Sequence, residues 1–347
     1  MKMRSIQYWG PGDIRLEEVS VKPLEEGEVL VKVESALTCG TDVKTYKRGH
    51  PLLIKEIPSG FGHEFSGVVA QLGKNVEGFK VGDRVVAANS APCGECFFCK
   101  KEEFNLCENL HLLNGAYAEY IAVPARIVKK NMLILPDNLS FDKAAFCEPL
   151  ANVVHGIERT EIKAGQTVGI IGIGPIGLMF AKLAKLKGAT VIAAGRNPLK
   201  LELAREFSGA DEVIDLNKYP NPEKIFLSFT EEKKGLDVAV ECVGLPSIWE
   251  RIFSLVRPGG TVHFFGGCKS GSTVTFDTTR MHYGDIKMMS VFHHTPKYFR
   301  QALDLIASGQ IPVEKLITGK IGLDGVQEAL EKHIDGKAIK FLIKPQT

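Results

Sequence analysis

The sequence predicts an α/β protein that joins a mostly β part to a doubly wound parallel sheet. Short β-type runs separated by glycine and proline fill residues 1–130. Further along, apolar runs alternate with helical segments, which is typical of a parallel sheet covered by helices. A glycine-rich turn, GIGPIG, follows the first of these apolar runs. A chain of 347 residues is long enough for two such domains with separate cores.

The β part is expected to be irregular. Its strand-like runs are rich in valine and alternate with turn residues. The clearest are VLVKVESAL, FSGVVAQLG, GDRVVAAN and AYAEYIAVP. A single helix is then predicted over residues 140–160, where Ser140 is placed to cap its first turn.

The alternating part begins at TVGIIGIG and runs to about residue 290. Its predicted strands are separated by helices, as the crossover connections of a parallel sheet require. They are TVGIIGIG, ATVIAAG, DEVIDL, LDVAVECVG and GTVHFFGG. Beyond them, residues 294–309 form one amphipathic helix, and KAIKFLIKP is predicted to be a final strand.

Composition excludes several classes of function. The net charge is +2, and no basic run with interleaved aromatics is present, so nucleic acid is not expected as a partner. No apolar stretch reaches membrane-spanning length, and the first residues lack the apolar core of a signal peptide. Eight cysteines, four of them clustered, are typical of metal binding in a reducing compartment. We therefore expect a cytoplasmic protein.

Cys93, Cys96, Cys99 and Cys107 give the strongest chemical signal. Their spacing suits four thiolates closing around one zinc ion. Such a site has no open coordination position, so it predicts a structural metal. Four cysteines also hold iron–sulfur clusters, and spacing alone leaves that alternative open.

GIGPIG predicts a dinucleotide site at residues Gly172, Gly174, Pro175, Ile176 and Gly177. It stands between a predicted strand and a predicted helix, as the fingerprint requires. The glycines allow a tight turn, close approach of the pyrophosphate and packing of helix on strand. The amides at the start of the helix favour the phosphate charge. The alternative is a glycine-rich turn without a ligand.

The end of the next strand favours NADP over NAD. An NAD site carries an acid about 20 residues after the turn, at the end of that strand. Here Gly195 stands in that place, followed by Arg196 and, one helical turn on, by Lys200. These cations suit a 2′-phosphate. The alternative is that Arg196 is a solvated surface residue and the cofactor is NAD.

A second metal site is indicated by Cys39 in TCGTD, His63 and Glu64 in GFGHEFSG, and Glu148 in FCEPLA. Three protein ligands plus water are the usual form of catalytic zinc. Asp42 is placed to fix the tautomer of His63. Taken singly, His63 would be interpreted as a structural histidine and Cys39 as a buried thiol.

Together, these motifs resemble the zinc-containing medium-chain alcohol dehydrogenases over nearly the whole chain. The closest likeness is to the sorbitol (polyol) and threonine dehydrogenase branch. The matching segments are CGTD at 39–42, GHE at 62–64, residues 67–85, the four-cysteine lobe, EPL at 148–150 and GIGPIG. The resemblance implies a GroES-like catalytic domain of residues 1–148 and 293–347, and a Rossmann domain of residues 149–292.

The resemblance also implies two zinc ions per subunit, one catalytic and one structural, with NADP or NAD. Cys39, His63 and either Glu64 or Glu148 would hold the catalytic zinc, which lowers the pKa of a substrate hydroxyl before hydride moves to the nicotinamide. Thr41 matches the hydroxyl that starts a proton relay. Lys44 replaces a relay histidine of many relatives and is expected to be a surface lysine.

Two further side chains match positions of this family. Lys340 matches a basic residue that contacts the cofactor pyrophosphate, with an exposed strand lysine as the alternative. Tyr117 matches an aromatic residue that lines the substrate pocket, but an aromatic in a β run is more often part of the core.

The function favoured is hydride transfer between a polyol or other secondary alcohol and NADP, with an enzyme like L-threonine 3-dehydrogenase as the alternative. Two other hypotheses stay open: a zinc-independent reductase of the quinone-reductase type, and a non-enzymatic protein that binds zinc or nucleotides. By resemblance, we expect a homo-oligomer, dimer or tetramer, paired at the edge of the nucleotide domain's sheet.

Overall fold

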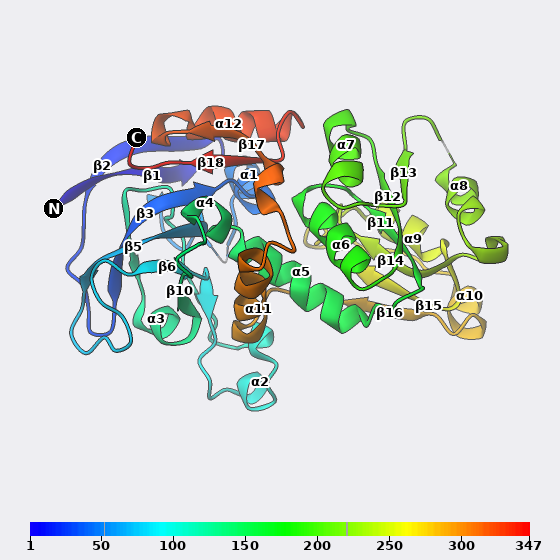
Figure 1. Cartoon of the computed structure of the whole chain (residues 1–347), viewed down its shortest axis with the longest axis horizontal. Helices are drawn as coiled ribbons and strands as arrows, with labels where there is room; N and C mark the ends of the chain where they lie inside the picture. Colours follow the sequence, from blue (N-terminus) through cyan, green and yellow to red (C-terminus); the bar gives the residue numbers. More distant parts are fainter. Residues whose placement is uncertain (52, 220) are drawn as a thin grey trace. The chain divides into compact units, whose positions relative to one another are not determined.

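The computed structural model describes residues 1–51, 53–219 and 221–347. Over these residues the chain divides into two compact units, one of Met1–Ala151 with His294–Thr347 and one of Asn152–His293. Each unit has its own main sheet (Figure 1) and its own hydrophobic core. The predicted boundaries, after residue 148 and before residue 293, lie close to the ends of these units.

The first unit is built on a mixed sheet with the order β10-β6-β5-β3-β18-β17 and β9 paired with β3. Smaller sheets join β2, β1 and β4, and join β7 and β8. The strands of this unit are β1 (Lys2–Gly10), β2 (Asp13–Ser20), β3 (Val29–Leu37), β4 (Ser59–Gly60), β5 (Glu64–Leu72), β6 (Arg84–Ala87), β7 (Ser90–Ala91), β8 (His111–Leu112), β9 (Tyr120–Val123), β10 (Met132–Ile134), β17 (Ile317–Ile321) and β18 (Lys340–Ile343).

Strand β3 is the centre of that sheet and corresponds to the predicted run VLVKVESAL. Val29, Val31 and Val33 are fully buried, and the strand pairs with β5, β9 and β18. β-branched side chains pack well on a pleated surface that is covered, which explains the apolar run. Its pairing sets Leu37 opposite Glu64 and opposite Leu342.

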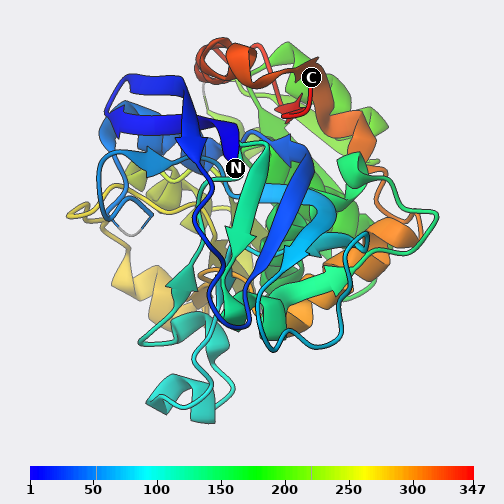
Figure 2. The same cartoon turned by 90° about the vertical axis from the view of Figure 1, so that its left-hand side faces the viewer.

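Short helices connect these strands. The helices of the first unit are α1 (Gly40–Arg48), α2 (Phe97–Lys100), α3 (Ala125–Asn131), α4 (Phe141–Ala144), α11 (Pro296–Ala307) and α12 (Val326–Ile334), with short 3₁₀ helices η1 (Phe104–Leu106), η3 (Val313–Leu316) and η4 (Leu323–Gly325). The segment that carries α2 projects from the rest of this unit, and both chain ends belong to this unit (Figure 2).

The single helix predicted over residues 140–160 is wrong, because the chain forms two helices there. Ser140 caps α4 as predicted, accepting from the N–H of Lys143, but α4 ends at Ala144. Helix α5 (Cys147–Thr160) then begins in the first unit and ends in the second. Pro149 explains the interruption, since it has no N–H to donate to the preceding turn. Its position in the first turn of a new helix is well tolerated.

The second unit contains a parallel sheet with the strand order β13-β12-β11-β14-β15-β16. This is the order of a doubly wound nucleotide-binding fold, so the predicted fold class is confirmed. The strands are β11 (Thr167–Ile171), β12 (Thr190–Gly195), β13 (Glu212–Asp215), β14 (Leu236–Glu241), β15 (Val256–Phe264) and β16 (Lys287–Ser290). The short strand β16 was not predicted.

Helices of the second unit pack on this sheet, with α6 against β11 and β12 and α9 against β14 and β15. Four of them begin with proline at the first helical position, where its missing N–H has no helical partner to lose. The helices that follow α5 in the second unit are α6 (Pro175–Leu186), α7 (Pro198–Glu206), α8 (Pro222–Ser228), α9 (Pro246–Phe253) and α10 (Thr278–Tyr283), with the 3₁₀ helix η2 (Glu231–Lys233).

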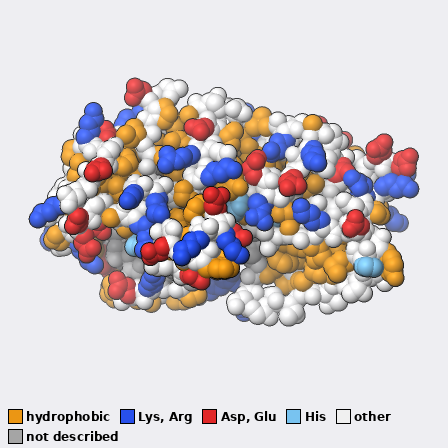
Figure 3. Space-filling model, turned by 90° about the horizontal axis from the view of Figure 1, so that it is seen from below, with side chains coloured by type: hydrophobic (Ala, Val, Ile, Leu, Met, Phe, Trp, Pro, Cys, Tyr) orange, Lys and Arg blue, Asp and Glu red, His pale blue; other side chains and the backbone are white. Residues whose placement is uncertain are grey.

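The surface carries both signs of charge. Lysine, arginine, aspartate and glutamate side chains are interspersed over the face shown in Figure 3, as the small net charge leads one to expect. Among the described residues, no helix combines the length and the apolar character needed to cross a membrane.

A buried histidine lies in the core of the second unit. His263 is fully buried, with the rings of Phe180 and Phe265 edge-on to it. The hydroxyl of Thr160 donates to the carbonyl of Gly156 at 2.6 Å, so Thr160 Oγ1 accepts from Nδ1–H of His263, also at 2.6 Å. Burial lowers the pKa of His263 to about 4. The folded protein therefore holds this imidazole neutral.

We predict that His263 makes the second unit less stable in acid. An unfolded histidine binds a proton near pH 6.5, whereas folded His263 does so only near pH 4. The free energy of unfolding is therefore fully retained above pH 6.5 and falls by up to about 1.4 kcal/mol per pH unit as the pH decreases toward 4.

Urea unfolding of His263→Asn at several pH values tests this, since asparagine keeps a donor for Thr160 without titrating. The variant should show a shallower dependence on pH than the native protein, while the exposed-site control His282→Asn should not. Equal slopes in native protein and His263→Asn would contradict the prediction.

Candidate active site

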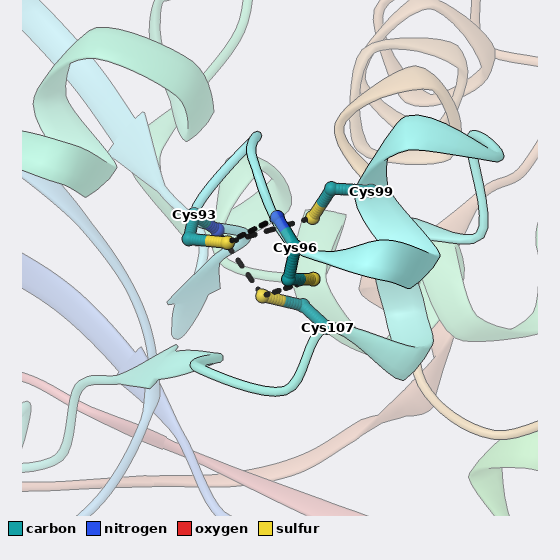
Figure 4. A group of neighbouring side chains, drawn as sticks. All are labelled: Cys93, Cys96, Cys99 and Cys107. Atoms are coloured by element: carbon teal, nitrogen blue, oxygen red, sulfur yellow. Dashed lines mark hydrogen bonds between the residues drawn. The ribbon is translucent and has the colours of Figure 1, made fainter.

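The four clustered cysteines converge on one point. Their sulfurs all lie within 4.8 Å of one another, with Cys93 to Cys99 and Cys96 to Cys107 both at 3.9 Å (Figure 4). A tetrahedron of 2.3 Å zinc–sulfur bonds has edges of about 3.8 Å. The spacing therefore fits a single ion that touches all four sulfurs, and leaves no room for a multi-iron cluster.

Backbone N–H groups of the lobe point at these sulfurs. Cys93 Sγ accepts from the N–H of Glu95 at 3.5 Å and of Cys96 at 3.4 Å, and Cys107 Sγ accepts from the N–H of Cys93 at 3.2 Å. The N–H groups of Glu95 and Cys96 lower the pKa of Cys93 to about 6, whereas burial raises the pKa of Cys99 to about 12. The lobe thus supplies donors that favour the thiolate, which is the form that binds metal.

Cys39 caps the first turn of α1. Its sulfur accepts from the N–H of Thr41 at 3.4 Å, and the Asp42 carboxylate accepts from the N–H of Cys39 at 2.9 Å. This reciprocal pair satisfies amide donors that every helix start leaves open. The turn holds the Cys39 thiol at the end of β3.

Strand pairing brings His63 and Glu64 to the same place. Because Leu37 lies opposite Glu64 in the antiparallel pair of β3 and β5, the residues just after β3 lie beside the start of β5. Ligand atoms of Cys39, His63 and Glu64 all lie within 4.8 Å of one another. His63 and Glu64 are buried.

Asp42 fixes the orientation of His63. Oδ1 of Asp42 lies 3.0 Å from Nδ1 of His63, and both side chains are buried. A carboxylate at Nδ1 keeps the proton there and leaves the lone pair on Nε2 for a metal. The same carboxylate outweighs burial and raises the pKa of His63.

The cluster suits a divalent cation. Burial raises the pKa of Cys39 and raises that of Glu64 to about 7, the latter against the pull of Lys340. Glu64 Oε1 is buried and has no hydrogen-bond partner among the described residues. A cation would favour the deprotonated forms of both groups and satisfy that oxygen. One sulfur, one imidazole nitrogen and one carboxylate form a donor set that zinc prefers.

The two candidate glutamates have different surroundings. Glu64 belongs to the cluster with Cys39 and His63. Glu148 is buried in the first turn of α5, where its Oε1 lies 3.9 Å from Nε2 of His294. Its charge nevertheless raises the pKa of Glu64. Glu148 as a direct metal ligand therefore stays a prediction.

Lys340 is not the exposed strand lysine that the sequence left as an alternative. Its side chain is 2% exposed, its ammonium pairs with Oε2 of Glu64, and it donates to the carbonyl of Thr38 at 2.8 Å. β18 runs beside β3, which explains how residue 340 reaches the cluster. The predicted contact of Lys340 with a pyrophosphate stays a prediction.

Thr41 and Lys44 both lie on α1. The N–H of Thr41 contacts the Cys39 sulfur, so its side chain is carried next to the cluster by the helix start. Lys44 is exposed, in line with the surface lysine that was expected.

The GIGPIG turn has the geometry of a dinucleotide loop. Gly172 has φ +98°, and a Cβ there would lie 2.9 Å from the carbonyl carbon of Cys242. A Cβ on Gly177 would lie 1.9 Å from the carbonyl oxygen of Gly172, whereas Gly174 has open space around it. Gly174 is the N-cap of α6, and Pro175 is its first residue, followed by Ile176. An open backbone at a helix start suits a phosphate.

A pocket lies at the end of β12, where Arg196 forms part of its wall. Gly195 is buried, and a Cβ there would lie 2.3 Å from Cγ1 of Ile173, so an acid does not fit without movement of that side chain. Arg196 is exposed, while Lys200 is half-buried and burial lowers its pKa. The pocket is lined by Ile171, Arg196, Leu216, Tyr219, Pro222, Ile248 and Arg251.

Sequence reasoning missed one side chain, Arg251, and one contact, that of Tyr117 with Asp42. Arg251 enters the pocket from α9, and nothing local to it indicates that the fold brings it near Arg196. Tyr117 was interpreted as a core aromatic. It is fully buried as expected, but its hydroxyl contacts the Asp42 carboxylate. The available signal was chemical, since a buried tyrosine hydroxyl usually finds a partner.

Comparisons with known proteins identify both units. Residues 25–137 match the family model described as alcohol dehydrogenase GroES-like domain, and residues 175–308 match that of zinc-binding dehydrogenase. The first match lies in the first unit. The second begins at Pro175, within the GIGPIG turn, covers the parallel sheet from β12 to β16 and extends into α11 of the first unit.

Curated relatives span almost the whole chain. Sorbitol dehydrogenase of Bacillus subtilis is 32% identical over 342 residues, covering 96% of this chain and 94% of the relative. L-threonine 3-dehydrogenase of the same organism is also 32% identical, covering 95% and 94%. A solved structure from Sinorhizobium meliloti, described as a zinc-binding dehydrogenase bound to NADP, superposes with a TM-score of 0.91 at 32% identity, covering 99% of this chain and 100% of the other.

We predict that Cys99→Ser removes one metal ion and destabilises the first unit. A structural zinc contributes directly to folding, so the melting temperature should fall on the order of 5–10 °C. Metal analysis should show the zinc content falling from two ions to one per chain. Cys268→Ser, outside both clusters, is the matched control. Loss of metal from the Cys39 cluster with an unchanged melting temperature would refute the assignment.

Proposed function

The chain belongs to the zinc-containing medium-chain alcohol dehydrogenases, in their polyol and threonine dehydrogenase branch, and from this membership we propose that it transfers hydride between a polyol or other secondary alcohol and NADP. Because members of this family are dehydrogenases, the non-enzymatic hypothesis is excluded. The observation that carries the proposal is the buried cluster of Cys39, His63 and Glu64. A zinc-independent reductase would not need this set of donors.

We assign roles to the residues of this cluster. Zinc, when bound, supplies the Lewis acidity that lowers the pKa of a substrate hydroxyl. Cys39, His63 and Glu64 would hold it, and Asp42 keeps the proton of His63 on Nδ1. Thr41, at the start of α1, takes the first step in moving the substrate proton toward solvent. Lys44, exposed on the same helix, leaves the rest of that path to water.

A hydroxylated substrate is supported by the polar character of the cluster. Two buried carboxylates, Glu64 and Glu148, lie close enough for the charge of one to raise the pKa of the other. The second candidate is L-threonine, since a threonine dehydrogenase has the same 32% identity to this chain as a sorbitol dehydrogenase. Both substrates are secondary alcohols.

NADP is favoured over NAD by the end of β12. Gly195 cannot carry the acid that binds a ribose 2′-hydroxyl unless Ile173 moves, and Arg196 and Arg251 both line the adjoining pocket. Two guanidinium groups suit a 2′-phosphate. Arg251 also pairs with Glu223 at 3.3 Å, so Arg196 is the more available of the two.

We further propose a cytoplasmic homo-oligomer. No disulfide joins any two of the eight cysteines, all of which lie within the described residues, and this suits a reducing compartment. β16 is one of the two edge strands of the second unit's sheet, and nearby Tyr283 is 83% exposed. An edge strand with exposed apolar neighbours is suited to pairing with a second copy. Light scattering would show a monomer if this proposal is wrong.

We predict zinc-dependent oxidation of polyols. Sorbitol, arabinitol, xylitol, butanediol and L-threonine should be assayed with NADP and with NAD, before and after treatment with a chelator. Chelation, or the substitution Cys39→Ala, should lower kcat/KM at least about a thousandfold, because the Lewis acid is lost. Binding of NADPH, measured by its fluorescence, should be unchanged in Cys39→Ala. Full turnover after verified removal of the metal would contradict the proposal.

We predict that Arg196→Ala weakens NADP selectively. A charge-assisted hydrogen bond contributes about 1.5–3 kcal/mol, so the KM for NADP should rise on the order of 10- to 100-fold while that for NAD changes little. Lys163→Ala, an exposed cation of the same unit outside the pocket, is the control. An equal change in both KM values would show that Arg196 does not distinguish the two cofactors.

A further inference from the structure

The hydroxyl of Tyr117 completes the hydrogen bonding of Asp42. Oδ2 of Asp42 accepts from the N–H of Cys39 at 2.9 Å and also contacts the Tyr117 hydroxyl, while Oδ1 faces Nδ1 of His63. The hydroxyl also lies 3.0 Å from the carbonyl oxygen of Leu37. A phenol has one proton to donate, and a carboxylate is the stronger of the two acceptors. Tyr117 is therefore the third donor to a buried charge.

The main chain holds Tyr117 in register with the ligand segment. The N–H groups of Gly115 and Ala116 both donate to the carbonyl of Gly62, at 2.8 and 2.9 Å, and that of Tyr117 donates to Phe61 at 2.8 Å. The carbonyl of Tyr117 accepts from Ile6 of β1 at 2.8 Å. Tyr117 is thus fixed from both sides, next to the residue that precedes His63.

The ring of Tyr117 lies against the backbone of Gly62. A Cβ at Gly62 would lie 2.3 Å from Cδ1 of that ring, and its φ of +88° is one that other residues rarely adopt. Phe61 contacts the same ring edge-on, with centroids 5.7 Å apart. One side chain therefore packs on the chain before His63 and reaches past it to Asp42.

We propose that Tyr117 is a positioning residue for the metal ligand His63: by donating to Asp42 it holds that carboxylate where Oδ1 accepts from His63 Nδ1, and so directs Nε2 at the metal. The inference rests on the proposed function only in that Cys39, His63 and Glu64 bind zinc. Without the hydroxyl, a buried carboxylate oxygen loses one of its two donors, and the hold on the imidazole is loosened.

Tyr8 offers a matched control. Its side chain is also buried and stacks on Phe61 with centroids 5.8 Å apart, on the same aromatic cluster. Its hydroxyl has no hydrogen-bond partner within the part of the chain that the structure describes. Tyr8→Phe and Tyr117→Phe therefore delete the same atom from the same core, and only the second deletion touches Asp42.

The experiment is competition between a chromophoric chelator and the purified zinc-loaded protein. Tyr117→Phe should weaken zinc binding at the Cys39 site about tenfold and leave the four-cysteine site unchanged. Tenfold is the lower end of the losses in metal affinity that follow removal of a group hydrogen-bonded to a metal ligand. The absorption bands of cobalt substituted at the weakened site should shift. Tyr8→Phe should stay within about twofold of the native protein. Native affinity and native cobalt bands in Tyr117→Phe would overturn the proposal.

A double-mutant cycle tests whether the hydroxyl acts through Asp42. In an Asp42→Asn background, the further change Tyr117→Phe should alter zinc affinity by less than about twofold. Additive losses of zinc affinity in the double variant would show that the hydroxyl does not act through Asp42. A Tyr117→Phe protein that fails to fold, while Tyr8→Phe folds, would show that the role of the hydroxyl is only structural. Either result would overturn the proposal. A native protein that binds zinc only at the four cysteines would instead contradict the proposed function.

Discussion

The buried carboxylate of Asp42 is the group on which the candidate metal centre of the first unit depends. It closes the first turn of α1 around Cys39, faces Nδ1 of His63 and contacts the hydroxyl of Tyr117. An ionised carboxylate taken out of water without donors costs several kcal/mol, so these three segments gain stability by staying together. The hydrogen bonds to Asp42 that stabilise this part of the fold therefore also orient the imidazole of His63.

The dinucleotide loop of the second unit is positioned differently, by glycines whose lack of a side chain lets backbone segments pack closely. Gly172 and Gly177 approach so closely that a methyl group on Gly177 would lie 1.9 Å from a carbonyl oxygen, and Gly195 leaves its space to Ile173. Close packing transmits such clashes to the backbone, because protein interiors contain little free volume. A buried polar network tolerates a substitution that keeps its donors, whereas these glycine contacts tolerate no added atom without movement.

What was predictable from the sequence follows from how local each signal is. GIGPIG and the four cysteines lie within short segments, so spacing and neighbouring sequence indicated a dinucleotide loop and a metal site, although not which metal. The meeting of Cys39 with His63 depends on the pairing of Leu37 with Glu64, which no local pattern contains. Lys340 lies 276 residues from its partner Glu64. The break between α4 and α5, by contrast, had a local signal in Pro149. It was not predicted because the apolar residues on both sides of the break keep helical spacing.

The two proposed metal centres need their ions for different reasons. In the four-cysteine lobe the donors to sulfur come from neighbouring amides, and little apart from the ion joins the four sulfurs. There the metal would stabilise a short loop by linking four of its side chains through one ion. The Cys39 cluster is assembled by paired strands from distant parts of the chain, so its geometry exists before any ion binds. Its need is electrostatic, because a thiol and a carboxyl whose pKa burial has raised require a cation to become ligands. A site with three protein ligands would leave its metal a fourth coordination position for a substrate, which the closed four-cysteine site does not.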